Sequence, residues 1–190
     1  MRRLTPADYR RMPWRNGGGT TTEILVEPDH RGEPSLAAER FHYRLSIADV
    51  AADGPFSRFD GYDRHIMLLS GGGMTLECGV HGRIDLRAPF EPRSFAGEWD
   101  VQGSLVAGPV QDFNLIVDRA TASSSLEVSL IDAPVEILLD SGRVCIVHVI
   151  DGTLADAGTG DTIVADTSFV LVPKGVARVA IAHIVFRIPQ

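Results

Sequence analysis

Residues 44–71 read RLSIADVAADGPFSRFDGYDRHIMLLSG, a stretch that holds two strand patterns with a turn between them. The first residues alternate polar and apolar side chains, so Arg44 and Ser46 share one face of the expected strand. The connection 53–57 contains the turn formers Gly and Pro, and an apolar run at 65–70 ends at a glycine triplet. Short strands joined by such turns are typical of β-proteins.

The same pattern extends through the rest of the chain, where 19 glycines and 11 prolines separate short apolar runs. Only residues 5–12 suggest a helical turn, with Thr5 as its N-cap and Pro6 as its first residue. Many short strands with Gly/Pro turns predict an all-β sandwich or barrel. The expected strands are 20–27, 41–48, 65–70, 74–78, 83–86, 113–118, 126–131, 144–150, 162–165, 169–172 and 176–187, the last broken near Ala182.

The second half of the chain repeats a feature of the first. The segment 68–71 ends a strand and begins a glycine turn, and 149–152 does the same later in the sequence. A link rich in Ala, Ser and Thr at 119–125 separates the two copies. We therefore expect a lobe at 1–120 and a smaller, related lobe at 121–190 that contributes to a common core.

Composition excludes several classes of protein. The formal net charge is −7 and no basic stripe exists to neutralise phosphates, so a nucleic-acid partner is not expected. No run approaches the length of a membrane span, and the N-terminal residues lack the apolar segment of a signal peptide. The two cysteines, Cys78 and Cys145, do not form a disulfide framework. These features predict a cytoplasmic protein without a membrane association.

Motifs for metal, nucleotide or nucleophilic chemistry are absent from the sequence. No histidine pair has the H-x-H or H-E-x-x-H spacing, so we expect neither a metal site nor another cofactor. His148 and His183 lie on separate expected strands, and only the fold decides whether they meet. The glycine run at 17–19 leads into a strand and not into a helix, which argues against a nucleotide site. No G-x-S-x-G surrounds a serine.

Polar residues on apolar strands are the remaining candidates for chemistry. Arg64 follows Asp63 at a strand mouth, where it would offer a guanidinium to a ligand carboxylate or form a solvated ion pair of little energetic value. The spacing alone favours the ion pair. Asp112 and Asn114 share one face of a core strand, where they either contact a ligand or cap neighbouring turns. The sequence leaves that choice open.

Three blocks of these residues resemble the HutD/Ves family. They are PWRNGGGTTTEI at 13–24, then LSIA at 45–48 with DGPFS at 53–57 and the following Phe59, Gly61 and Asp63-Arg64, and finally GPV at 108–110 with DFNL at 112–115. The resemblance implies a cupin-like bicupin fold, two β-barrel lobes with few short helices, and places the ligand pocket in the first barrel. It also implies a link to histidine utilisation in some members and to stress in others, with no established reaction.

By position in these blocks, the resemblance assigns the ligand-binding site to seven residues, and we assign their roles. Arg64 would pair with a carboxylate, and Trp14 would stack on a planar group. Amide and hydroxyl groups would bond the polar end, while Glu23 or Asp112 would accept from a ligand N–H or hold Arg64. His65 stands where an apolar residue is expected, and alternation turns it away from Arg64. The seven residues are Trp14, Asn16, Glu23, Ser46, Arg64, Asp112 and Asn114.

Three functions remain open at this point. The first is non-catalytic binding of a small carboxylate or imidazole-type metabolite, such as urocanate or a formyl- or formimino-glutamate, that regulates histidine utilisation. The second is a metal-independent hydrolase or isomerase for a similar acid, with Asp112 or Glu23 as general base. The third is a stress-linked interaction protein with a vestigial pocket. We favour the non-catalytic role, and a homodimer is the assembly that exposed sheet edges invite.

Overall fold

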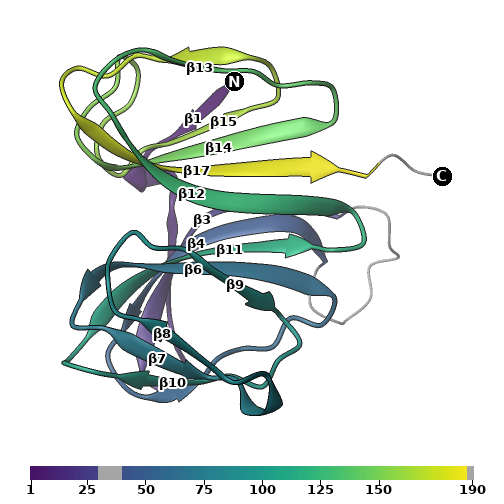
Figure 1. The fold of residues 1–190 in the computed structure, drawn as a ribbon, viewed down its shortest axis with the longest axis vertical. Coiled ribbons are helices and arrows are strands. Elements are labelled where there is room, and N and C mark those ends of the chain that lie inside the picture. Colours follow the sequence, from purple (N-terminus) through teal and green to yellow (C-terminus); the bar gives the residue numbers. More distant parts are fainter. Residues whose placement is uncertain (30–39, 188–190) are drawn as a thin grey trace. The chain divides into compact units, whose positions relative to one another are not determined.

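The computed structural model describes residues 1–29 and 40–187 and divides the chain into two units (Figure 1). The first barrel comprises Arg10–Thr121, and the second barrel comprises Met1–Tyr9 together with the chain from Ala122 onward. The sequence predicted lobes at 1–120 and 121–190, whereas the first nine residues group with the chain that follows Thr121. The reason is that β1 (Arg2–Leu4) pairs with β15 (Thr162–Ala165).

The first barrel consists of two antiparallel sheets with an apolar core between them. A six-stranded sheet has the order β2-β3-β4-β11-β6-β9, and a four-stranded sheet has the order β5-β10-β7-β8. Apolar residues from both sheets, among them Ile66, Leu68, Met74 and Leu76, form the core. The strands are β2 (Arg10–Pro13), β3 (Gly19–Pro28), β4 (Phe41–Val50), β5 (Gly54–Pro55), β6 (Tyr62–Gly71), β7 (Met74–Glu77), β8 (Arg83–Leu86), β9 (Arg93–Ala96), β10 (Gln102–Leu105) and β11 (Val110–Asp118).

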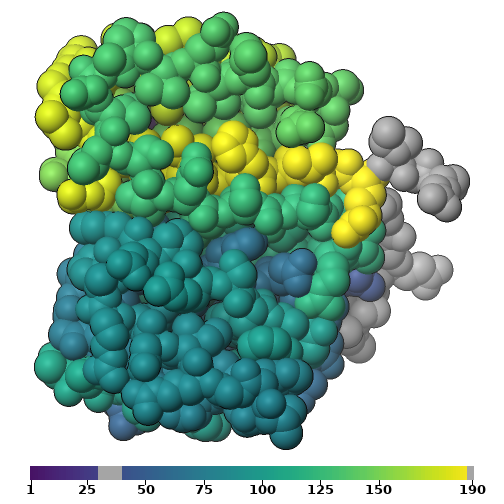
Figure 2. Space-filling view, viewed as in Figure 1, coloured from purple at the N-terminus to yellow at the C-terminus, as the bar shows by residue number. Residues whose placement is uncertain are grey.

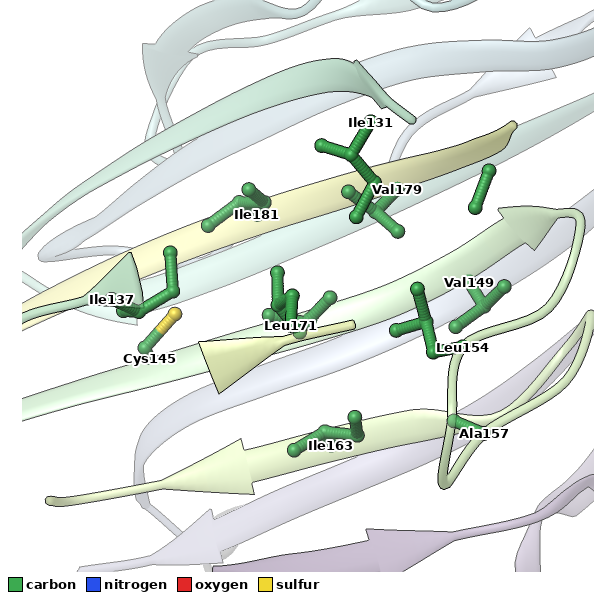
Figure 3. Packing of buried hydrophobic residues seen from close by; sticks show 12 residues of the cluster. Ile131, Ile137, Cys145, Val149, Leu154, Ala157, Ile163, Leu171, Val179 and Ile181 are labelled. Carbon is green, nitrogen blue, oxygen red and sulfur yellow. The ribbon is translucent and has the colours of Figure 1, made fainter. Parts of the chain in front are cut away.

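The second barrel repeats this plan with fewer strands. A five-stranded sheet has the order β1-β15-β14-β17-β12, and β13 pairs with β16 in a separate two-stranded sheet. Figure 3 shows how Cys145, Val149, Val179 and Ile181 point into its apolar interior. Its other strands are β12 (Ala122–Ile131), β13 (Val135–Ile137), β14 (Arg143–Asp151), β16 (Phe169–Leu171) and β17 (Ala177–Phe186).

The all-β class predicted from the sequence is confirmed, and the differences concern short or polar segments. The only helical residues described are two single 3₁₀ turns, Pro6–Asp8 and Gly79–His81. The expected link at 119–125 is wrong in its second half, because Ala122–Ile131 is a strand that pairs with β17 along its whole length. β17 also continues through Ala182 without the expected break. Strands of two to four residues, such as β5 and β10, are too short to show a period in the sequence.

Two glycines mark the repeated part of the two barrels. Gly71 has φ +104°, and a Cβ on it would lie 2.7 Å from Val110 Cα at the start of β11. Gly152 has φ +92°, and its Cβ would lie 2.8 Å from Ala177 Cα at the start of β17. A register shift occurs beside each glycine, in the β6–β11 pair and in the β14–β17 pair. The two barrels therefore share a strand–glycine–strand unit.

The space-filling view shows each unit as a closely packed body, mainly blue and teal for the first barrel and green to yellow for the second (Figure 2). Across the described ranges, no helix is long and apolar enough to cross a membrane.

Candidate functional site

The first barrel contains a cavity of about 460 Å³ on the inner face of its larger sheet. The strands β3, β4, β6 and β11 of this sheet contribute to it, and β5 and β10 of the smaller sheet, together with the segment after β4, close one side. Every second residue of β4 and β11 faces this space, and several of these residues are polar. The residues between them, such as Leu45 and Phe113, are buried on the other face. A cavity of this size suits a small metabolite.

The strand register brings the polar residues together in rows. Arg44, Ile116 and Arg64 lie opposite one another across β4, β11 and β6. The next row holds Ser46 and Asn114, and the one beyond it holds Asp112. Arg64, Asn114 and Asp112 therefore follow one another diagonally across the floor of the cavity.

Arg64 is buried at the cavity floor, with 5% of its surface exposed. Its Nη1 donates to the carbonyl oxygen of Ser57 at 3.1 Å, and its Nη2 donates to Asn114 Oδ1 at 2.9 Å. The guanidinium carbon lies 5.0–5.5 Å from the centres of three phenyl rings, those of Phe56, Phe59 and Phe95. Burial lowers the pKa of Arg64 to about 10, and the charge of Asp112 opposes that shift. The side chain is thus a buried cation held by two hydrogen bonds and surrounded by three phenyl rings.

Asp112 is the last residue of the diagonal Arg64–Asn114–Asp112 and is fully buried. Asn114 Nδ2 donates a short hydrogen bond to Asp112 Oδ1. Burial raises the pKa of Asp112 to about 7, although the charge of Arg64 and the bond from Asn114 act in the opposite direction. The carboxyl group is therefore poised to titrate near neutral pH.

Two polar atoms of this diagonal have no hydrogen-bond partner among the residues described. They are Arg64 Nε and Asp112 Oδ2. Both are buried, and burial of an unpaired donor or acceptor costs about 1–3 kcal/mol, more for a charged group. In folded proteins a ligand, an ion, a proton or an ordered water satisfies such groups. Two unpaired atoms of opposite character on residues that line one cavity are the main sign of a binding site here.

The rim of the cavity is built by the turn between β2 and β3. Trp14 Nε1 donates to Thr21 Oγ1 at 2.8 Å, which holds the indole against the cavity. Asn16 Oδ1 accepts the Gly18 N–H at 3.0 Å, and the Gly17 N–H bonds the Trp14 carbonyl oxygen. These amides serve the turn itself and do not form an anion cradle. A Cβ on Gly19 would lie 2.4 Å from the Asp49 carbonyl oxygen, so only glycine fits there.

Six of the seven expected residues line the cavity, and Glu23 does not. Glu23 forms an ion pair with Arg44 Nε at 2.8 Å instead of holding Arg64. Asp63 does not pair with Arg64 either, because it forms an ion pair with Arg119 at 2.7 Å on the opposite face of β6. The six that line it are Trp14, Asn16, Ser46, Arg64, Asp112 and Asn114.

Several lining residues were missing from the sequence prediction. Arg44 shares the face of Ser46, so alternation was a sufficient signal for it. Phe56, Ser57 and Phe59 belong to the 53–59 connection, and no local pattern in the sequence shows that this connection folds over Arg64.

The histidines form no metal site in the parts of the chain that are described. His65 faces away from Arg64, as expected, and its Nδ1 bonds Ser94 Oγ at 2.7 Å. His148 pairs in register with Ala180 and His183 with Cys145, so their side chains lie on opposite faces of the sheet and cannot share an ion. No group of three or more His, Cys, Asp or Glu that would hold a metal occurs within 1–29 and 40–187. His30 lies outside those ranges.

Comparison with known proteins identifies close relatives. A family model described as HutD matches residues 6–182. A protein of Pseudomonas putida, described as an uncharacterized 21.2 kDa protein in the hutC 3′ region, is 44% identical over 113 residues, which are 60% of this chain and 56% of that protein. Protein Ves of Citrobacter koseri is 37% identical over 126 residues, 64% of this chain and 62% of its own length. The matches thus span less than two thirds of these relatives.

Solved structures extend the likeness to nearly the whole chain. HutD from Pseudomonas fluorescens SBW25, solved in a formate condition, is 29% identical with a TM-score of 0.78 and covers 98% of both chains. A conserved protein of unknown function from Pseudomonas aeruginosa PAO1 is 30% identical with a TM-score of 0.80, covering 96% of this chain and 97% of that one.

A more distant likeness concerns the fold alone. The pirin YhhW of Escherichia coli is 12% identical with a TM-score of 0.63 and covers 98% of this chain and 99% of its own. This confirms the cupin-like fold. The family association with histidine utilisation agrees with the relative encoded beside hutC. Since the family model spans most of the sequence, the chain belongs to the HutD family.

Proposed function

We propose that this protein binds a small metabolite with a carboxylate group in the first-barrel cavity, without converting it, and thereby regulates histidine utilisation in the cytoplasm. The observation that carries the proposal is Arg64, a buried cation with an unpaired Nε at the floor of a cavity of about 460 Å³. An arginine has five N–H donors, and its hydrogen bonds to described residues use two of them. The remaining donors suit a carboxylate oxygen.

The other lining residues define what surrounds that carboxylate. Ser46 and Asn114 lie one row away from Arg64 and offer hydroxyl and amide groups to polar atoms of the ligand. The Trp14 indole at the rim suits a planar group such as an amide or imidazole. A short acid with a polar or planar second end matches this arrangement. Urocanate and the formyl- and formimino-glutamates implied by the family resemblance have that form, and the HutD solved in a formate condition makes formate a useful fragment to test.

Differential scanning fluorimetry against a defined panel tests the proposal. The panel contains histidine, urocanate, imidazolonepropionate, formiminoglutamate, N-formylglutamate, glutamate, formate and divalent metals. We expect one acid of the pathway to raise the melting temperature, because a ligand at about 100 times its Kd stabilises the folded state by roughly 2.7 kcal/mol. If none of the acids stabilises the protein, the proposal is overturned. A shift with a metal alone would contradict the metal-independent role.

A pair of arginine variants locates the site. Arg64→Lys keeps the charge but loses the planar donor set, and we expect it to abolish the stabilisation. Arg58→Lys is the matched control, because Arg58 lies on the connection that precedes β6 but is exposed and does not line the cavity. Calorimetric titration of both variants reports binding directly if either is less stable.

A second candidate is a hydrolase or isomerase that uses Asp112 as general base. The observation in its favour is the pKa of Asp112, which burial raises to about 7, the range in which a general base works best. Glu23 is less suited to this role because it is paired with Arg44. Incubation of each stabilising acid with stoichiometric protein, followed by mass spectrometry, decides between the two. Unchanged ligand supports binding alone, and turnover that Asp112→Asn abolishes while binding persists supports catalysis.

A further inference from the structure

We infer that the cavity takes up its carboxylate ligand together with one proton, and that Asp112 Oδ2 holds this proton in the bound state. The inference rests on the proposed function, since it requires an anion at Arg64. It makes Asp112 the residue that couples ligand binding to proton concentration, a role that no resemblance assigns to it.

The buried charges around Asp112 balance before any ligand arrives. Arg64 on β6 is the cation that faces it, and Asn114 stands between them as a neutral bridge. Arg44 on β4 is neutralised by Glu23 on β3 at 2.8 Å. Asp49, on the other face of β4, adds a negative charge that disfavours ionised Asp112.

The charges at the rim of the cavity do not alter this balance. Arg15 and Asp53 line the cavity, but both are exposed to solvent, so water screens them. Asp49 is itself contacted by Gln111 Nε2 at 2.8 Å and by Arg11 at 3.6 Å. Among the cavity residues described, Arg64 is therefore the buried cation that has no directly bonded carboxylate, since Asn114 lies between it and Asp112.

A ligand carboxylate at Arg64 upsets this balance. Two carboxyl groups would then lie near one guanidinium, and the repulsion between like charges at such a site disfavours their simultaneous ionisation. The pKa of Asp112 already lies near 7 because of burial, and the added negative charge raises it further, so that Asp112 stays protonated in the complex at and above about pH 8. The proton comes from solvent and binds to Oδ2, which is buried and unpaired. Oδ1 continues to accept from Asn114 Nδ2.

Protonation also turns an acceptor into a donor. Ionised Asp112 presents only acceptors, whereas the protonated group carries one O–H donor on the buried Oδ2. Proton uptake thus removes the repulsion between the ligand carboxylate and Asp112. Above the pKa of Asp112 in the free protein, linkage predicts that affinity falls by about tenfold for each pH unit.

Isothermal titration calorimetry with N-formylglutamate tests the inference, because this probe has no group that titrates near neutral pH. Titrations at about pH 8 in phosphate and in Tris, buffers with different ionisation enthalpies, count the protons taken up per ligand. We expect close to one proton at about pH 8, nearly none at about pH 6, and a Kd about tenfold higher at pH 8 than at pH 6, with most of the rise above pH 7. Equal heats in both buffers with an unchanged Kd would overturn the inference and leave the proposed function standing.

Variants assign the proton to Asp112. Asp112→Asn keeps an acceptor for Asn114 and mimics the protonated group, so we expect binding without proton uptake and with a flat pH profile. Asp60→Asn is the matched control, because Asp60 is an exposed carboxylate of the same barrel that does not line the cavity, and it retains the wild-type proton uptake. Persistent proton uptake in Asp112→Asn would overturn the assignment. If that variant does not fold, the wild-type proton count and pH profile still decide.

The outcomes separate this inference from the proposed function. If no acid of the panel binds at any pH, the proposed function fails and the inference fails with it. If an acid binds without uptake of a proton at about pH 8, only the inference fails.

Discussion

Asn114 is the residue on which the cavity floor depends, because both ends of its amide are used. Its Oδ1 accepts from Arg64 and its Nδ2 donates to Asp112, so one neutral side chain keeps a buried cation and a buried carboxyl group in contact through hydrogen bonds. Both charged groups are largely shielded from water, since Arg64 and Asp112 are 5% and 0% exposed. Loss of the bridge would leave polar atoms on both neighbours without partners.

The first prediction concerns this bridge. We expect Asn114→Leu to lower the free energy of unfolding by about 2–5 kcal/mol, because two buried groups lose a partner at once. Urea denaturation measures the change.

The same strand supplies the control for this variant. Gln111 lies on the opposite face of β11, is only half-buried, and makes one hydrogen bond to Asp49. We expect Gln111→Leu to cost about 1 kcal/mol or less. Equal losses for the two variants would show that the buried bridge has no special role.

His148 is a second residue with a measurable signature, and it lies in the second barrel. It is 3% exposed, and its Nδ1 and Thr162 Oγ1 share a hydrogen bond of 2.9 Å. Thr162 in turn bonds the Tyr9 hydroxyl at 2.8 Å, which connects the histidine to the N-terminal segment of that barrel. Burial lowers the pKa of His148 to about 4, and the charge of Asp161 only partly opposes this.

The second prediction follows from that lowered pKa. Between the unfolded pKa of about 6.5 and the folded value of about 4, the unfolded chain binds a proton that the folded chain excludes, so stability falls with falling pH by about 3 kcal/mol. We expect His148→Gln to remove this part of the slope. Denaturation curves at a series of pH values measure it, and the same substitution at the exposed His81 is the control. An unchanged slope in His148→Gln would contradict the assignment.

At the scale of the element, the junction between strand and glycine turn is the feature that both barrels share. Gly71 lies against the backbone at the start of β11, and Gly152 lies against the start of β17. Both have positive φ, and both sit beside a register shift in the paired strands. The junction therefore requires glycine for two reasons, backbone conformation and lack of space.

The third prediction separates these two reasons. We expect Gly71→Ala and Gly152→Ala to lower the free energy of unfolding by more than about 3 kcal/mol each, since strain adds to a clash with backbone atoms. Gly61 and Gly142 have positive φ with open space around them, so alanine there should cost only about 1–2 kcal/mol of conformational strain. Thermal or urea unfolding of the four variants tests the comparison, and similar costs at all four positions would refute the packing argument.

At the scale of the molecule, the two barrels differ in the side chains at equivalent positions, which are polar around the cavity of the first barrel and apolar in the second. Counting back equally from each glycine places Cys145 where Arg64 lies, and counting forward from the contacted strand start places Val179 and Ile181 where Asp112 and Asn114 lie. All three replacements belong to the apolar cluster that fills the second barrel (Figure 3). One strand framework thus supports a filled core in one barrel and a polar cavity in the other.

The fourth prediction uses this contrast. Hydrogen exchange measured by mass spectrometry should show that a stabilising acid increases amide protection in β4, β6 and β11, the strands that line the cavity. β14 and β15 of the second barrel serve as the internal reference, because their inner face is filled by apolar side chains. Equal protection of both sets of strands would place the ligand elsewhere.

The sequence by itself determined the fold class and the longer strands. Alternation in 41–48 and the apolar runs before Gly71 and Gly152 depend on neighbours along the chain, and such local patterns are visible without a structure. The same alternation placed Asp112 beside Asn114 on one face and turned His65 away from Arg64. The family motifs supplied six of the residues that line the cavity.

Only the tertiary structure decided the partners of those residues. The spacing favoured Asp63 as the partner of Arg64, but pleating sends neighbouring side chains to opposite faces, and Asp63 pairs with Arg119. Pairing of β1 with β15 moved the first nine residues into the second barrel. The phenyl rings around Arg64 and the burial that brings Asp112 to a pKa near 7 arise from segments far apart in the sequence. Contacts and desolvation of this kind depend on packing across strands, which no pattern within one segment contains.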